Sequence, residues 1–291
     1  MRTVGGARMW RAAVGATRRA ALPRAGRGAT PRDPAATPRP GPAAARAGRD
    51  PCRDLPRNDP RQYDALADQW GRPGGAFAVL RWLAAARAAL IPAARRPGAL
   101  LLDLGCGGGL LAPYVAGLGY RHVGVDVTAS ALRYAAGRGV RPVLADATAL
   151  PVADGVAEVV VAGELFEHVA DLPAAVAEAC RVLAPGGVLV LDTLNDTRLS
   201  RWLTITVAER LPRVPVGLHD PARYVDPARL GALCARHGVR LRVRGARPTV
   251  LPTLRWLVSG DDRGRIVPIR STAVLYQGLG VRAAGRTAPD G

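Results

Sequence analysis

Three glycines at alternate positions, directly after an apolar run, mark the first place in the chain that could hold a ligand. The run Ala99–Leu104 has the length and composition of a central parallel strand. Gly105, Gly107 and Gly109 follow it, and glycines let the backbone turn tightly and let a ligand approach main-chain atoms that a Cβ would block. A dinucleotide fingerprint needs a small residue where this chain has Leu110, so that class of site fits poorly.

Acidic residues end the two strands that we expect after this turn. Asp126 follows the strand expected over 122–125, about 20 residues after the glycines, where an acid accepts hydrogen bonds from ribose hydroxyls. Asp146 and Ala147 end the strand expected over 141–145, where a carboxylate can bond an adenine amino group and a backbone amide can address the ring. A surface aspartate at a strand end is the alternative for both acids.

Two glutamates and a histidine share one side of a helical turn. Glu164, Glu167 and His168 stand at i, i+3 and i+4 after the strand expected over 156–162, at the edge where substrate should lie. Two carboxylates and one imidazole can hold a divalent ion, which could lower the pKa of a phenolic hydroxyl. In the alternative without metal, a glutamate helps to position cofactor and His168 is structural or a general base.

Alternating strands and helices must position these groups. The alternation predicts a parallel sheet with helices on both faces, in which ligands bind beyond the carboxyl ends of the strands. A helix over 76–90 would lie over that end, so its Arg87 could reach a carboxylate of the cofactor, with a solvated helix arginine as the alternative. Further helices are expected from Asn58 onward and over 110–118, 129–136 (capped by Thr128), 172–183 (closed by Pro185-Gly186-Gly187) and 228–237, and further strands over 188–193, 239–245 and 272–279.

The two ends of the chain differ from the middle in composition. Residues 1–57 are rich in Arg, Ala, Pro and Gly. The first 50 residues contain 11 Arg and 2 Asp, so their net charge of +9 is half of the formal net charge of +18. Because large apolar side chains are scarce there, we expect a disordered leader, with a transit-like presequence and a nucleic-acid-binding arm as alternatives. We expect one folded domain over 58–282 and a loose tail over 283–291.

The cysteines and the apolar stretches bear on the compartment. Cys52, Cys106, Cys180 and Cys234 form no Cys-x-x-Cys pair, which argues against structural zinc and fits a reducing cytoplasm. No stretch has the length of a signal core or of a membrane span, so we expect a cytoplasmic protein. Cys106 lies inside the glycine turn, and we expect it to be a small residue in a tight space rather than a nucleophile.

From Tyr63 to Arg282 the sequence resembles the ubiquinone-biosynthesis O-methyltransferases, which methylate polyprenyl catechols and demethylubiquinol. The turn Asp103-x-Gly-x-Gly-x-Gly109 and the segment Pro185-Gly-Gly187 are general to class I S-adenosylmethionine (SAM) methyltransferases. More specific to the family are Gly163-Glu-Leu-Phe-Glu-His-Val169, Asp192-Thr-Leu-Asn195, Val216-Gly-Leu-His-Asp220 and Tyr224-Val-Asp-Pro-Ala-Arg-Leu230. The resemblance implies a Rossmann-like fold with a mostly parallel, seven-stranded sheet that has an antiparallel edge.

The resemblance also implies roles for single residues. It implies SAM contacts from Arg87, Gly105, Asp126 and Gly163, and a divalent metal, magnesium, at Glu164, Glu167 and His168. The cofactor-contacting positions that we predict include in addition Asp103, Cys106, Gly107, Gly109, Val127, Asp146 and Ala147. The chain departs from the family at Asp68-Gln69-Trp70, where a Trp-Trp pair is usual, at Gly163, where a Met is usual, and over 248–269. These departures lie where substrate would be held, so they bear on the acceptor and not on the use of SAM.

An apolar, arginine-flanked helix is expected within an insertion over 197–220. Its apolar residues are Leu199, Trp202, Leu203, Ile205, Val207 and Leu211. Such an insertion covers the substrate in the family, and an amphipathic helix with Trp and Arg suits a membrane interface, so we expect peripheral membrane contact. Packing of the helix onto the domain is the alternative.

The function that we expect is transfer of the SAM methyl group to a phenolic oxygen of a quinol- or catechol-like small molecule, which could be prenylated, with help from a metal. One alternative is a metal-independent methyltransferase that acts on another small metabolite. A second, from another class, is a nucleic-acid-binding protein that uses the basic N-terminal segment, although we expect no specific nucleic-acid partner.

Overall fold

The computed structural model describes residues 55–284. The predicted leader therefore lies outside the described residues except for its last three, and the predicted tail lies outside them except for its first two. Eight strands form one sheet in the order β3-β2-β1-β4-β5-β8-β6-β7. Strands β1 to β5 run parallel, whereas β8 is antiparallel to β5 and to β6, and β7 is antiparallel to β6. The strands are β1 Ala99–Leu104, β2 Tyr120–Asp126, β3 Arg141–Leu144, β4 Ala157–Gly163, β5 Leu183–Leu194, β6 Val239–Pro248, β7 Ile266–Ile269 and β8 Leu275–Arg282.

The central strands are apolar throughout because both of their faces are buried. Along β1, Leu100, Leu102 and Leu104 join one cluster with α6 and α8, while Leu101 joins another with α4. Residues that alternate along a strand point to opposite faces of the sheet, so this division places a helical layer on each side. The helices that cover the two faces are α3 Ala78–Ala88, α4 Ala112–Val115, α5 Ala129–Gly137, α6 Leu172–Arg181 and α8 Pro227–Arg236.

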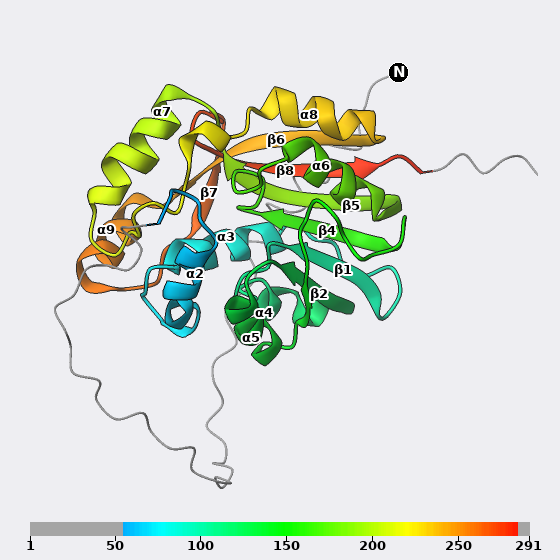
Figure 1. The fold of residues 1–291 in the computed structure, drawn as a ribbon, viewed down its shortest axis with the longest axis horizontal. Helices are drawn as coiled ribbons and strands as arrows, with labels where there is room; N and C mark the ends of the chain where they lie inside the picture. The colour runs from blue at the N-terminus through cyan, green and yellow to red at the C-terminus, as the bar shows by residue number, and fades with distance from the viewer. Residues whose placement is uncertain (1–54, 285–291) are drawn as a thin grey trace, which may run out of the picture.

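Most of the remaining short helices lie at one end of the sheet, which α3 also reaches; the 3₁₀ turn η2 lies at the opposite end, just before β2. Figure 1 shows α2, α3, α7 and α9 on the same side, and α7 follows the carboxyl end of β5 almost directly. Ligands in sheets of this kind bind at that edge. The helices are α2 Arg61–Ala65, η1 Ala67–Gly71, η2 Ala116–Leu118, α7 Arg198–Arg201, the π-helical turn η3 Trp202–Val207, η4 Ala208–Arg210, η5 Pro221–Arg223 and α9 Val250–Ser259.

The structure corrects four expectations about single elements. The sheet has eight strands rather than seven, because β7 pairs with the far part of β6, and α9 lies between them without having been predicted. The segment Pro185-Gly186-Gly187 lies within β5 instead of closing a helix, at a place where the register against β4 shifts. Thr128 precedes α5, but its side chain forms no capping hydrogen bond. The predicted helix over 110–118 is shorter and ends in the 3₁₀ turn η2.

Within residues 55–284, none of the helices is both long enough and apolar enough to span a bilayer.

Candidate active site

The glycine turn after β1 adopts the backbone conformation that its composition predicts. Gly105, Gly107 and Gly109 have φ values of +63°, +50° and +72°, in the left-handed region that favours glycine. A Cβ at Gly107 would lie 2.5 Å from the Trp70 ring, so the indole packs directly on the turn. A Cβ at Gly105 would meet Leu165 and one at Gly109 would meet Ala135, so packing as well as backbone conformation requires glycine at these positions.

Asp126 holds this turn from the neighbouring strand. Its Oδ2 accepts a hydrogen bond from the backbone N–H of Gly107 at 2.8 Å, and its Oδ1 accepts one from the N–H of Thr128 at 2.8 Å. Burial raises the pKa of Asp126, while these two amides oppose the rise. The carboxylate thus joins the ends of β1 and β2, at the place where ribose hydroxyls are predicted to bind.

The other predicted cofactor positions lie along the same edge. Asp146 is exposed after β3, and its Oδ1 accepts hydrogen bonds from Thr148 N and Oγ1, while Ala147 is buried beside it and Val127 is 53% exposed. Two further positions lie deeper. Asp103 is buried with its Oδ2 3.3 Å from His122 Nε2, and burial raises the pKa of the Cys106 thiol, which keeps that thiol protonated. Cys106 is therefore a buried, uncharged side chain that packs in a tight space.

A buried ion pair closes the edge at the end of β4. Arg87 of α3 donates from Nη1 to Oδ1 of Asp192 at 2.5 Å, and both side chains are almost fully buried. A Cβ on Gly163 would come within 2.2 Å of the Arg87 guanidinium, so the glycine is what lets the arginine lie across the strand end. The Arg87 Nε atom is buried without a hydrogen-bond partner, which leaves one donor free for an anionic group. This arrangement suits the predicted contact with the carboxylate of SAM.

Glu164 belongs to this ion-pair group. Its backbone has a φ of +49°, in the left-handed region, and its N–H donates to Asp192 Oδ1 at 3.1 Å. Burial raises the pKa of Glu164 well above its ordinary value, and the nearby carboxylates of Glu167 and Asp192 raise it further. The Arg87 guanidinium opposes this rise in the pKa of Glu164.

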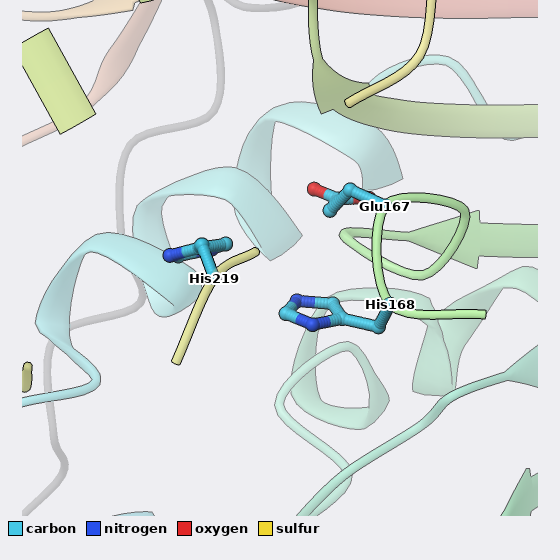
Figure 2. Close-up of side chains that lie close together, drawn as sticks. All are labelled: Glu167, His168 and His219. Atoms are coloured by element: carbon cyan, nitrogen blue, oxygen red, sulfur yellow. The ribbon is translucent and has the colours of Figure 1, made fainter. Parts of the chain in front are cut away.

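Glu167 and His168 meet a third side chain that was not predicted as part of the site. One ligand atom each from Glu167, His168 and His219 lie within 4.8 Å of one another (Figure 2). Glu167 is fully buried, its Oε2 accepts from Thr193 Oγ1 at 2.7 Å, and burial raises its pKa to about 7. Desolvation lowers the pKa of His168 well below its ordinary value and that of His219 to about 4, so both imidazoles are neutral at pH 7.

The predicted magnesium site fits this geometry in part. Among the described residues, Glu167 and His168 lie within 4.8 Å of a third possible ligand, His219, and Glu164 is not part of that group. The Glu164 carboxyl nevertheless interacts with Glu167 as well as with Asp192 and Arg87, and its Oε1 atom is buried without a hydrogen-bond partner. The set of Glu164, Glu167 and His168 therefore stays a prediction, and no reaction step below depends on a magnesium ion held by it.

Asn58 sets the hydrogen bonding of His168. The amide Nδ2 of Asn58 donates to the backbone carbonyl of His168 at 2.9 Å, which fixes which way the amide faces. The Oδ1 atom must then accept from Nδ1–H of the His168 ring, so that the ring Nε2 carries the lone pair. Nε2 has a weak contact with the Tyr63 hydroxyl at 3.5 Å.

Four residues at this edge were missed as site residues. Asp192 and His219 lie in segments that the sequence analysis quoted only for their resemblance to a family, and Asn58 was taken as a helix start. Trp70 was read only as a departure from the family. Each lies far along the chain from the glutamates and from the glycine turn, so spacing could not bring them together.

Comparison with known proteins identifies the chemistry that this edge serves. A family profile described as a methyltransferase domain matches residues 102–191. The chain is 34% identical over 189 residues to the ubiquinone biosynthesis O-methyltransferase of Thiobacillus denitrificans, a match that covers 61% of this chain and 81% of that protein. The enzyme of the same name from Caulobacter vibrioides is 34% identical over 206 residues, covering 63% of this chain and 81% of its own. The chain belongs to the ubiquinone biosynthesis O-methyltransferase family.

The fold of this family member agrees with a distant solved structure. A SAM-dependent methyltransferase from Thermotoga maritima superposes with a TM-score of 0.52 at 18% identity, covering 76% of this chain and 95% of that one. This likeness concerns the fold alone. The predictions of a Rossmann-like methyltransferase fold and of a SAM-dependent methyltransferase are confirmed, and the contacts assigned to single residues stay predictions.

Proposed function

We propose that this methyltransferase transfers the SAM methyl group to a phenolic oxygen of a quinol- or catechol-like small molecule. The observation that carries the proposal is the neutral His168, whose Nε2 carries the lone pair and whose ring lies close to buried Glu167 at the edge predicted to bind the cofactor. A phenol has a pKa of about 10, so it needs a base before it attacks at neutral pH. The names of the relatives, which refer to ubiquinone biosynthesis, agree with an acceptor of this type.

The reaction needs one proton transfer and one displacement. His168 Nε2 takes the phenolic proton, and the phenolate oxygen forms a bond to the methyl carbon while the carbon–sulfur bond breaks. The electron pair of that bond stays on sulfur, which gives S-adenosylhomocysteine. Arg87 and Asp126 hold the two ends of the cofactor, and the buried surroundings keep water from the sulfonium. A divalent cation beside Glu167 and His168 would supply the same help by lowering the pKa of a phenol bound to it.

The direct test is methyl transfer to a catechol, with S-adenosylhomocysteine and the methylated product measured by mass spectrometry. The wild type should form an aryl methyl ether, and His168→Ala should lose at least about 100-fold in kcat, within the range for general bases, while its affinity for S-adenosylhomocysteine stays within about twofold. Methylation on nitrogen or carbon, or full activity of His168→Ala, would overturn the proposal. Activity that a chelator leaves unchanged would keep the acceptor and remove the metal.

We also propose peripheral contact with an anionic bilayer, from which a prenylated acceptor would come. Two neighbouring elements at the catalytic end expose large apolar side chains, Leu199 and Trp202 on the insertion and Val250, Leu254 and Val258 on α9. The three on α9 stand at i, i+4 and i+8, on one face of the helix. Arginines of the insertion flank the patch, which suits a negatively charged surface. Other side chains of the insertion, such as Leu203, are half-buried, so the segment also packs onto the domain.

A further inference from the structure

Turns at the amino end of the sheet surround a hollow that no step of methyl transfer uses. Its volume is about 690 Å³, within the range of about 300–1,000 Å³ that is usual for small-ligand sites. The hollow lies where the chain enters β1, β2 and β3, at Gly98, Gly119 and Gly139, whose φ values are +76°, +83° and +83°. Since β1 has six residues that rise about 3.3 Å each, the hollow is about 20 Å from the glycine turn at the other end of that strand.

Three arginines line this hollow. Arg96 precedes β1, Arg121 lies near the start of β2 and Arg141 begins β3. All three are exposed, and within residues 55–284 their guanidinium groups form no ion pair or hydrogen bond. Arg141 pairs with Val123, two residues along β2 from Arg121, so both arginines stand on one face of the sheet with Cα atoms about 8 Å apart. Like charges at this spacing repel, and an anion between them would remove the repulsion.

The acidic side chains on the neighbouring strands are already paired with other groups. Asp103 Oδ2 lies 3.3 Å from His122 Nε2, and Glu158 Oε1 lies 3.3 Å from Arg95 Nε. None of the described residues that line the hollow is an aspartate or a glutamate. The hollow therefore holds positive charge that the described part of the chain does not balance.

We propose that Arg96, Arg121 and Arg141 bind a soluble ligand with two linked phosphoryl groups, either inorganic diphosphate or the diphosphate of a nucleotide. A guanidinium group is planar and can donate two parallel hydrogen bonds to phosphate oxygens. Three unpaired positive charges exceed the charge of about −1.5 to −2 that one phosphoryl group carries at pH 7, so two linked groups balance them better. The volume of the hollow also exceeds that of a single phosphoryl group.

The surroundings of the hollow favour a soluble ligand over a lipid headgroup. The exposed apolar side chains of α7 and α9 lie at the carboxyl end of the sheet (Figure 1), whereas the hollow lies at the amino end. Apart from Tyr120 and Pro97, the hollow is lined by glycine, arginine and histidine, which offer no apolar surface to insert into a bilayer. The ligand is therefore neither the cofactor nor the acceptor, and its binding does not rest on the proposed function.

Calorimetric titration of the full chain with inorganic diphosphate tests the site. The wild type should bind one diphosphate per chain, at least tenfold more tightly than orthophosphate. Arg121→Gln combined with Arg141→Gln should raise the diphosphate Kd at least tenfold, and Arg96→Gln alone should raise it at least threefold. Titration with ADP identifies the source: an affinity equal to or above that for inorganic diphosphate indicates a nucleotide, and a lower affinity indicates free diphosphate.

Arg240→Gln combined with Arg242→Gln is the matched control. These two arginines are exposed at alternate positions of β6, so this variant loses the same charge from the same sheet. Every variant keeps the basic N-terminal segment. The diphosphate Kd of the control should therefore differ from that of the wild type by less than twofold.

The opposite results overturn the proposal. Absence of diphosphate binding by the wild type removes the site, and equal losses in the two double variants assign binding to the total charge of the chain. Equal affinities for diphosphate and orthophosphate contradict a ligand with two phosphoryl groups. Competition between diphosphate and S-adenosylhomocysteine would place the anion at the cofactor edge instead. Titration of every variant with S-adenosylhomocysteine also checks the fold, and no measurement depends on methyl transfer, so failure of the proposed function would leave these results unchanged.

Discussion

At the scale of single residues, Asp126 has two predicted roles, which two measurements on one variant can separate. It holds the glycine turn through Gly107 N and is predicted to accept the ribose hydroxyls of SAM. Asp126→Ala should raise the Kd for S-adenosylhomocysteine at least about 10-fold, because even one hydrogen bond to a charged group contributes about 1.5–3 kcal/mol. Calorimetric titration measures this loss. An unchanged Kd would refute the ribose contact, and an unchanged melting temperature would show that the turn does not need the carboxylate.

The raised pKa of Asp126 predicts a pH dependence of cofactor binding. Only the ionised carboxylate accepts both hydroxyls, and a raised pKa means that protonation begins at a higher pH than for an ordinary aspartate, whose pKa is about 3.9. The affinity for S-adenosylhomocysteine should therefore fall as the pH is lowered toward the folded pKa. Asp126→Asn, which has no such proton to bind, should show a flatter profile, and equal slopes in the two proteins would contradict the assignment.

The buried Arg87–Asp192 pair predicts that losing one partner destabilises the fold more than losing the charge of both. Removing one partner leaves an uncompensated buried charge, so Arg87→Met should lower the free energy of unfolding by about 3–5 kcal/mol. The double variant Arg87→Met with Asp192→Asn should recover part of that loss. Urea denaturation of the wild type, both single variants and the double variant gives the coupling. Strictly additive losses would mean that the two side chains do not stabilise the fold as a pair.

At the scale of elements, the segment before α2 fastens the insertion to the site. Arg57 makes two hydrogen bonds of 2.7 Å to Glu209 of η4, and Glu209 also accepts from Gly217 N at 3.1 Å. Arg57 is partly exposed, so the pair should contribute about 1 kcal/mol or less to global stability. Its main effect should be local, because it links two segments that have few other bonds between them.

Hydrogen exchange can detect this local effect. In Arg57→Ala, amides from Ile205 to His219 should exchange several-fold faster than in the wild type, because opening of the insertion no longer breaks the pair. Arg61→Ala is the matched control, since among residues 55–284 the Arg61 side chain pairs with Asp59 alone, two residues away. Equal exchange in the two variants would show that Glu209 is held in place by other contacts.

The elements also show how far sequence alone could go. Strands such as β1 and β4 were predictable because burial on both faces imposes a continuous apolar run, and the glycine turn was predictable because left-handed φ values demand glycine. The position of His219 depends on the path of the insertion, which contains a π-helical turn without a local sequence signal. Asn58 reaches His168 only after folding. The sequence pattern therefore predicted the carboxyl edge of the sheet and its glycine turn. The residues around His168, such as His219 and Asn58, could be found only from the tertiary structure.

At the scale of the whole molecule, one end carries the predicted cofactor edge, the cluster of Glu167, His168 and His219, and the exposed apolar side chains of α7 and α9. Figure 1 shows α7 and α9 at that end. The strand β3 forms the edge of the sheet opposite β7. This distribution would let an acceptor dissolved in a bilayer reach His168 without crossing open water. It also means that binding to membranes and access to the active site should depend on the same few side chains.

Flotation with anionic liposomes tests this arrangement in the full chain. Trp202→Glu combined with Leu254→Glu should reduce the floated fraction at least tenfold, because burial of each large apolar side chain contributes about 1.5–3 kcal/mol and each glutamate adds repulsion. Leu144→Glu is the matched control, because Leu144 is 63% exposed on β3, at the far edge of the sheet. This variant and the double variant carry the same basic N-terminal segment. Equal flotation of the two variants would assign membrane binding to that segment. Strong flotation of the control together with loss in the double variant would instead place the membrane against α7 and α9, directly over the site that receives the acceptor.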